Sequence, residues 1–298
     1  MELIARWLLL AFWTLCVPIE GFGQKIEALK KLEQLEKKKR EPAKPTGAEE
    51  ELIDIDQVRE ELGVNEFTAP SIEQVLAELM DLRPIPIEKV WSDLPIGTPQ
   101  NRARLALASG RVIADGLLAV IAEKPSRVEP CARALLRFAK GLGVADHVTK
   151  HSKSIIEKAA KENWLDVRRE LVKAQADVES GMLALRDEEI AHLVSLGGWL
   201  RGLEIVSILI ADDFSAPRAA RLVQPEALEY FIDRISTLNP NLKAKALFQK
   251  IEEALKGIRG ATVKPDEMPL NIDDVKKVRD ITRELNARIA ETGARLEE

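Results

Sequence analysis

Two pairs of opposite charges lie inside long apolar stretches of this sequence, and they are the residues best placed to do chemistry. Arg111 and Asp115 are four positions apart, while Arg201 and Glu204 are three apart. On a helix, either spacing puts both members of a pair on one face, where they can meet. A buried charge without a partner costs several kcal/mol, so enclosed side chains of this kind must satisfy one another or a bound molecule.

Two interpretations of these four residues remain open. The first is a salt-bridge network between two helices that fixes how the helices pack. The second is a polar pocket in which an arginine receives the carboxylate or phosphate of a small ligand, so that Arg111, Asp115, Arg201 and Glu204 would be ligand-binding residues. A catalytic role for either acid as a general base is the weakest reading, because no nucleophile or metal ligand stands beside it in the sequence.

Glycines accompany both charge pairs. Gly110 and Gly116 flank the first pair, and Gly197, Gly198 and Gly202 surround Arg201 in the second stretch. Since glycine has no side chain, it lets two helix backbones approach closely. We therefore expect the two apolar helices to pack directly against each other.

The remaining chemistry-bearing residues predict no catalytic or metal site. His147 and His151 have the spacing of two ligands to one metal, but the intervening residues lack the glutamate of the zinc-protease pattern. We expect both to be polar surface residues, and we expect His192 to face a turn. The sequence has no nucleophile elbow, phosphate-binding loop or Cys-x-x-Cys pair, so we predict no metal and no cofactor and do not favour an enzyme.

The composition is that of an all-α protein that does not bind nucleic acid. Apolar residues make up 46% of the chain, enough for a core, whereas aromatic residues make up only 4%. Helix-forming residues are abundant and no alternating strand pattern competes with them. The net charge is −5, with no basic face of the kind that nucleic-acid-binding proteins carry.

The first 70 residues predict export and a tether. Residues 1–23 have a basic residue, an apolar run and a small-residue ending, which is typical of a cleaved signal peptide. An uncleaved membrane anchor is the alternative, although Pro18 and Glu20 interrupt the run. Residues 24–70 are charged and broken by prolines, as in a flexible tether. After cleavage Cys131 is the only cysteine, so we expect a buried apolar residue and no disulfide.

Residues 71–262 predict a bundle of about seven to nine helices. Capping residues mark helix starts at Ser71, Thr98, Ser126, Asn163, Asp187, Ser215 and Asn239. Two segments, residues 104–121 and 190–211, are apolar on every face and are expected to be enclosed by the other helices. The charges inside them argue against a lipid environment.

Residues 263–298 predict a linker and a C-terminal amphipathic helix capped by Asn271. Its apolar stripe alternates steps of three and four, as in a coiled coil: Val275, Val278, Thr282, Leu285, Ile289, Thr292 and Leu296. The stripe can dock onto the bundle or pair with a second copy or a partner. Both possibilities remain open from the sequence.

Together these features predict an exported helical protein, periplasmic or secreted, that acts by binding. The expected partner is an unknown protein or a small anionic ligand; no membrane span remains after signal cleavage, and a homo-oligomer is possible. One alternative is a structural or scaffold protein of the cell envelope that self-associates through the C-terminal helix. A second alternative is a hydrolase whose site carries no recognised motif.

Overall fold

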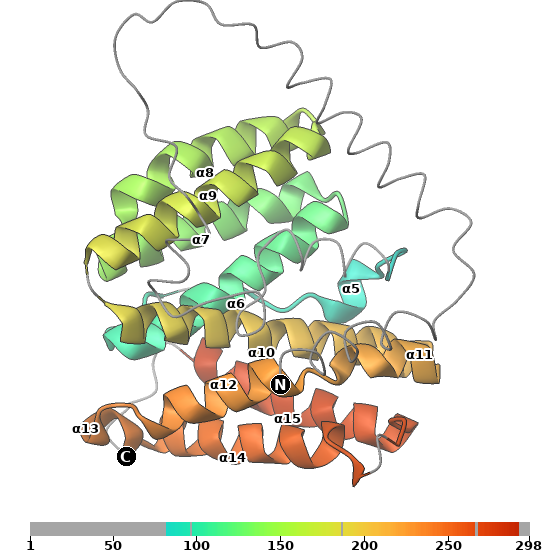
Figure 1. Cartoon of the computed structure of the whole chain (residues 1–298). Helices are drawn as coiled ribbons and strands as arrows, with labels where there is room; N and C mark the ends of the chain where they lie inside the picture. The colour runs from blue at the N-terminus through green and yellow to red at the C-terminus, as the bar shows by residue number, and fades with distance from the viewer. Residues whose placement is uncertain (1–81, 96, 186, 266–267, 292–298) are drawn as a thin grey trace, which may run out of the picture. The chain divides into compact units, whose positions relative to one another are not determined.

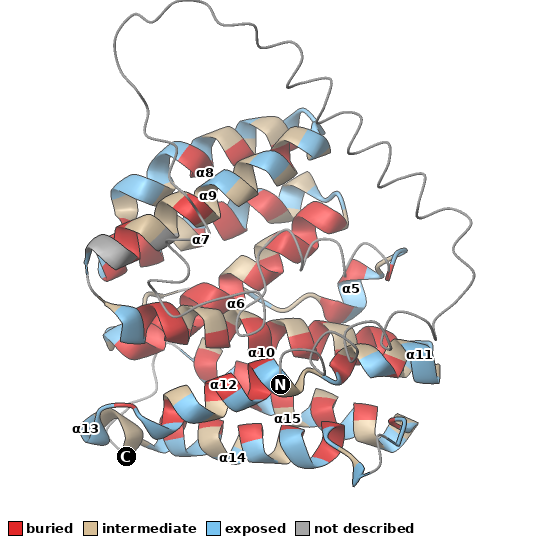
Figure 2. Cartoon of the chain, in the orientation of Figure 1, coloured by how far each residue is buried: buried red, intermediate tan, exposed pale blue. Residues whose placement is uncertain are grey.

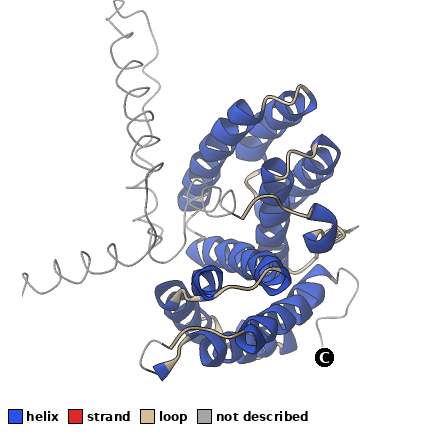
Figure 3. Ribbon diagram, turned by 90° about the vertical axis from the view of Figure 1, so that its right-hand side faces the viewer, coloured by secondary structure: helices blue, strands red, loops and turns tan. Residues whose placement is uncertain are grey.

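The structure is a computed structural model that describes residues 82–95, 97–185, 187–265 and 268–291. All of them belong to one compact unit, Ile53–Glu298. Every regular element in these ranges is helical and none is a strand, as Figure 3 shows, which confirms the all-α prediction. The predicted signal peptide, the tether and the helix start at Ser71 lie outside the described residues.

The helices follow one another with short connections (Figure 1). In chain order they are α5 (Ile87–Val90), α6 (Arg102–Ile121), α7 (Pro125–Leu142), α8 (Ala145–Ala160), α9 (Trp164–Ala184), α10 (Glu188–Asp212), α11 (Ala216–Ala219), the 3-10 turn η1 (Ala220–Leu222), α12 (Pro225–Ser236), α13 (Pro240–Lys243), α14 (Ala246–Thr262) and α15 (Ile272–Ala290). Within the described part of the chain from Thr98 to Thr262, the long helices are α6, α7, α8, α9, α10, α12 and α14. This number agrees with the prediction of about seven to nine helices.

Polar caps placed most helix starts correctly, with two shifts. The first is at Ser126: α7 already begins at Pro125, and Lys124 precedes it without a side-chain cap. Asn239 caps α13, and Asn271 forms a full capping box at the start of α15. The start predicted at Thr98 is wrong, because the side chain of Asn101 accepts from the backbone N–H of Arg104 and begins α6 there. Helix α7 ends at Gly143, whose φ of 85° is the left-handed conformation that glycine adopts without strain.

Helices α6 and α10 are the central pair, as their apolar patterns predicted. Figure 2 shows both as mostly buried, whereas α7, α8 and α14 are buried along one face. Helix α6 packs against α10 and α7, and α7 leads on to the α8–α9 pair. On the other side, α10 packs against α15, which contacts α14. The central pair is therefore covered by helices from both sides.

Helix α10 deserves comparison with a membrane span because it is long and apolar. Of the described helices it alone has the length and composition to cross a membrane, with a mean hydropathy of 1.6 over its most apolar stretch. However, 72% of that stretch is buried inside the fold. This burial is what the central helix of a bundle requires.

The C-terminal helix α15 docks onto the bundle. Its stripe residues Val275, Val278, Thr282, Leu285 and Ile289 are at most 3% exposed, and the helix contacts α10 and α14. Thr292 and Leu296 lie outside the described residues. Self-association through this stripe would require α15 to leave the two helices that now cover it.

Candidate functional site

The two central helices touch backbone to backbone where they cross. A methyl group built on Gly110 would lie 1.9 Å from the carbonyl oxygen of Val194, and one built on Gly197 would lie 2.1 Å from the carbonyl oxygen of Leu107. Both separations are far inside van der Waals contact. Gly198 is nearly as close, at 3.4 Å from the carbonyl oxygen of Gly110. These three glycines therefore perform the predicted role of allowing close approach.

The other two glycines do not belong to this crossing, so the expectation was wrong for them. A methyl group on Gly116 would meet Cβ of Cys131 on α7, at an ordinary 3.6 Å. One on Gly202 would meet nothing within 4 Å. Gly202 therefore faces open space, although it lies in the most apolar helix of the protein.

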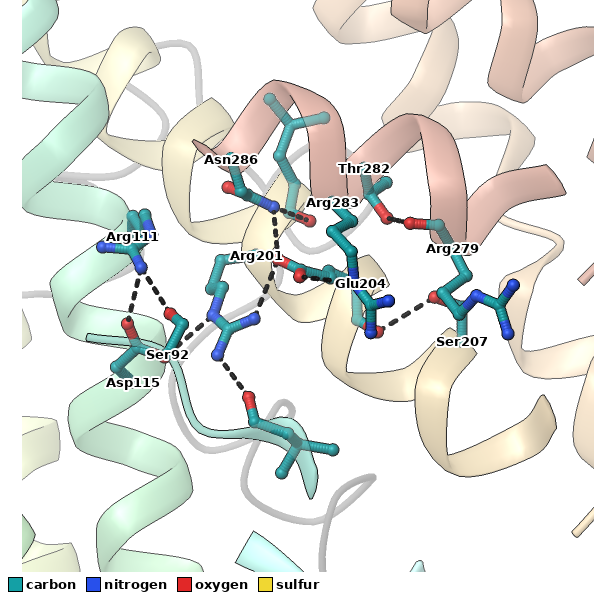
Figure 4. A network of polar contacts seen from close by, with 12 residues as sticks. Ser92, Arg111, Asp115, Arg201, Glu204, Ser207, Arg279, Thr282, Arg283 and Asn286 are labelled. Atoms are coloured by element: carbon teal, nitrogen blue, oxygen red, sulfur yellow. Dashed lines mark hydrogen bonds and ion pairs between the residues drawn. The ribbon is translucent and has the colours of Figure 1, made fainter. Parts of the chain in front are cut away.

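The four charged residues singled out in the sequence meet in one network between α6 and α10 (Figure 4). Nε of Arg201 donates to Oδ1 of Asp115 across the helix interface at 2.8 Å. Nη1 of Arg201 lies 2.8 Å from Oε2 of Glu204, one turn along its own helix, and Nη2 donates to the carbonyl oxygen of Val90. All three nitrogens of the Arg201 guanidinium are thus satisfied by the protein.

The pair expected within α6 is the loosest part of the network. Nη2 of Arg111 is 4.0 Å from Oδ2 of Asp115. That nitrogen instead donates to the Ser92 hydroxyl and, at 3.1 Å, to the carbonyl oxygen of Asp93. Arg111 therefore fastens the connector before α6 to the central pair.

The network also reaches α15. Nδ2 of Asn286 donates to Oε2 of Glu204 at 3.0 Å and to the carbonyl oxygen of Leu200 at 3.1 Å. Asn286 is only 2% exposed. This amide fixes the register of α15 on α10, because a shift of α15 along α10 would leave the buried amide without hydrogen-bond partners.

Burial and ion pairing act in opposite directions on the two arginines. Burial disfavours the charge of Arg201, but the attraction of Asp115 and Glu204 outweighs it and raises the pKa of Arg201. Burial dominates at Arg111 and lowers its pKa, although Asp115 opposes the change. Nε and Nη1 of Arg111 and Oδ2 of Asp115 have no hydrogen-bond partner among the described residues. Water could bind at all three atoms, and a small anion could bind at the two nitrogens of Arg111.

An apolar cavity of about 330 Å³ lies on other faces of the same two helices. Its lining along α10 includes Val194, Gly202 and Val206, and α9 contributes Leu171 and Val178. Helices α6, α7 and α8 add mainly apolar side chains, and Leu82, Arg221, Gln224 and Phe231 complete the lining. None of the four network residues lines it. The open space and the buried charges are thus separate features of the central pair.

A few polar side chains line the cavity, and His151 is the most constrained of them. Its Nδ1 lies 2.8 Å from Oε1 of Glu170 and its Nε2 lies 2.7 Å from Oδ2 of Asp177, both on α9. Both ring nitrogens are therefore engaged by carboxylates, which fixes the orientation of the ring. The expectation of a surface residue was therefore wrong for His151, which is 2% exposed, whereas His147 is exposed as predicted.

No metal site accompanies this cluster. Within the described ranges no group of three or more His, Cys, Asp or Glu side chains, this cluster included, is arranged to hold a metal ion. His192 is also buried, not facing a turn as expected: it hydrogen-bonds to the Tyr230 hydroxyl, and burial lowers its pKa to about 4. Cys131 is buried as predicted, and burial raises the pKa of its thiol to about 12, which makes it a poor nucleophile.

No protein-family model, curated protein or solved structure matches this chain. The geometry of the described residues is therefore the whole basis for interpreting the site. One feature of the sequence that the predictions did not use corresponds to the cavity. Small residues follow steps of four, three and four along one face of α10: Ala191, Ser195, Gly198 and Gly202. All four line the cavity.

Proposed function

We propose that this protein binds a small apolar molecule in the cavity lined mainly by α6, α7, α8, α9 and α10. The observation that carries the proposal is the apolar cavity itself, with Gly202 facing open space in its wall. Its volume of about 330 Å³ falls in the range of small-molecule sites. Such sites are lined mainly by apolar side chains with a few polar groups, as here.

The cavity is also accessible. Ile113, Leu171, Val178, Val194 and Val206 line it and are only half-buried. Apolar surface left in contact with water is unfavourable by about 25 cal/mol per Å². An apolar occupant would remove this surface from water, and that gain is the driving force for binding.

The buried charges are best explained as a register device. Arg201 is satisfied by three protein groups, and the network joins α6, α10 and α15 to the connector before α6. We propose that it holds the central pair in the alignment that forms the cavity. A small anion at the unpaired atoms of Arg111 is the competing role for these residues.

Binding of an apolar molecule suits the export predicted from residues 1–23. An apolar molecule is poorly soluble in the aqueous compartment outside the cytoplasm, so a protein that encloses it there can carry or store it. We infer a binding protein rather than a hydrolase: both nitrogens of His151 are engaged by carboxylates, and the neighbouring Ser152 hydroxyl donates to the carbonyl oxygen of Val148. Neither group is arranged as a base and nucleophile.

A matched pair of glycine substitutions tests the proposal. Gly202 and Gly260 both lie in helices, and a methyl group on either meets nothing within 4 Å, but only Gly202 lines the cavity. Gly202→Leu places a side chain in the space that the ligand would occupy. We expect it to weaken binding of the fluorescent apolar probe N-phenyl-1-naphthylamine by about tenfold or more, since about two methylene contacts are worth that much.

The Gly260→Leu variant is the control and should bind the probe as the unmodified protein does. Circular dichroism during heating would verify that both variants remain folded. Equal probe affinity in the two variants, or no saturable binding by the unmodified protein, would contradict a ligand site in this cavity.

A further inference from the structure

We infer that the ligand is a single extended hydrocarbon chain, such as a fatty acyl chain, that lies lengthwise along α10. The inference rests on the proposed function and adds the chemical class of the ligand. It depends on the length of the cavity, its volume and the side chains that form its walls.

The cavity is long. Its lining residues on α10 run from Ala191 to Val206, which corresponds to about 22 Å of helix at 1.5 Å per residue. On the facing helix α9 the lining runs from Leu171 to Met182, or about 16 Å. A compact ligand would contact only part of either row.

The cavity volume also fits an elongated ligand. About 330 Å³ is available beside about 22 Å of α10, so an extended chain contacts more of the wall than a compact molecule of equal volume does. The α10 wall explains why a chain can lie against it. Ala191, Ser195 and Gly202 place little side-chain bulk on this wall, and a methyl group on Gly202 would meet nothing within 4 Å. Gly198 also lines the cavity, but it lies against the backbone of α6 at the helix crossing.

The two ends of the cavity have different surroundings. At one end, the backbone N–H of Asp187 bonds to the carbonyl oxygen of Met182 at 3.4 Å, so the short turn from α9 to α10 lies beside the lining residues Met182 and Ala191. At the other end, Leu117 and Ile205 form an apolar cluster with the half-buried Leu171 and Val206. The hydrocarbon end of a chain inserted along α10 would therefore lie in the apolar cluster, and its other end would lie near the α9–α10 turn.

The test is a chain-length series. Saturated straight-chain fatty acids of increasing length should displace N-phenyl-1-naphthylamine with an affinity that rises about fourfold per methylene, the factor that corresponds to 0.8 kcal/mol. The affinity should stop rising once the chain fills the cavity. Two further series with the same chains distinguish the source of the chain. If the uncharged alcohols bind with the same affinity as the acids, the chain alone is recognised. If the lysophospholipids also bind with that affinity, the acyl chain of a lipid is accepted as well.

A substitution at one end of the cavity should make the affinity reach its plateau at a shorter chain length. Val206→Trp narrows the channel at the end opposite the α9–α10 turn, so the affinity should stop rising at a shorter chain. Val263→Trp is the control, because Val263 is 43% exposed and does not line the cavity. The Val263→Trp variant should reach its plateau at the same chain length as the unmodified protein.

The failures of the two proposals are distinguishable. If the compact apolar alcohol 1-adamantanol competes as well as the longest chain, or if affinity does not depend on chain length or never reaches a plateau, the chain inference is overturned while the apolar site stands. If neither the probe nor any chain binds the intact protein, the cavity is not a ligand site and both proposals are overturned.

Discussion

Replacing Gly110 with alanine will lower the free energy of unfolding by about 3 kcal/mol or more, because the added methyl group must displace the backbone of α10 rather than a side chain. The built position of that methyl group is 1.9 Å from the carbonyl oxygen of Val194. Neither helix can move alone, since each is enclosed by other helices. For a domain of this size we expect the melting temperature to fall by about 6 to 12 °C.

Gly202→Ala is the matched control for this experiment. The substitution is chemically identical and lies in the other central helix, but its methyl group meets nothing within 4 Å. Alanine favours a helix by up to about 1 kcal/mol relative to glycine, so this variant should be as stable as the unmodified protein or slightly more so. Thermal unfolding of the two variants side by side decides the matter. If Gly110→Ala and Gly202→Ala have the same melting temperature, the central helices are not in backbone contact.

Arg201→Met should produce the second large effect, a loss of about 3 to 5 kcal/mol in the free energy of unfolding, because it leaves two carboxylates enclosed without their main partner. Asp115 is fully buried and Glu204 is 6% exposed. Methionine preserves most of the volume of the arginine side chain, so the loss reports on the ion pairs and not on a cavity. Denaturant unfolding followed by circular dichroism measures it.

Arg283→Met provides the control for the loss of a positive charge near Glu204. Nε of Arg283 lies 3.9 Å from Oε1 of Glu204, but the Arg283 side chain is 56% exposed. An exposed ion pair contributes at most about 1 kcal/mol, so this variant should unfold almost as the unmodified protein does. A small effect of Arg201→Met together with loss of a bound anion would contradict the register role and favour the polar pocket.

The central pair was predictable from sequence because a helix that is buried on all sides has apolar residues on every face. Residues 104–121 and 190–211 carry apolar residues on every face, and the structure places them as α6 and α10 at the middle of the bundle. The cap at Asn271 was predictable for a similar reason, since it acts within one turn of its own helix.

The charge network was only partly predictable. Spacing within a helix identified Arg201 and Glu204 as a pair, and they do meet at 2.8 Å. Spacing also suggested Arg111 with Asp115, but the stronger partner of Asp115 is Arg201, which comes from the other helix. Contacts of this kind depend on how helices pack, which no local pattern encodes.

The cavity was the feature that sequence reasoning missed. Its walls come from helices that are distant in the chain, and whether they leave space depends on the angles between them. His151 illustrates the same difficulty. Its two carboxylate partners, Glu170 and Asp177, lie on the next helix, so its burial could not be inferred from α8 alone.

The most direct test of the ligand site is whether a bound chain touches Trp199, which lines the cavity and is 9% exposed. A fatty acid brominated along its chain quenches a tryptophan that it contacts. We predict saturable quenching of the protein's fluorescence that persists in Trp164→Phe and disappears in Trp199→Phe. Quenching that is unchanged in Trp199→Phe, or that never saturates, would contradict the placement of an apolar ligand along α10 in this cavity.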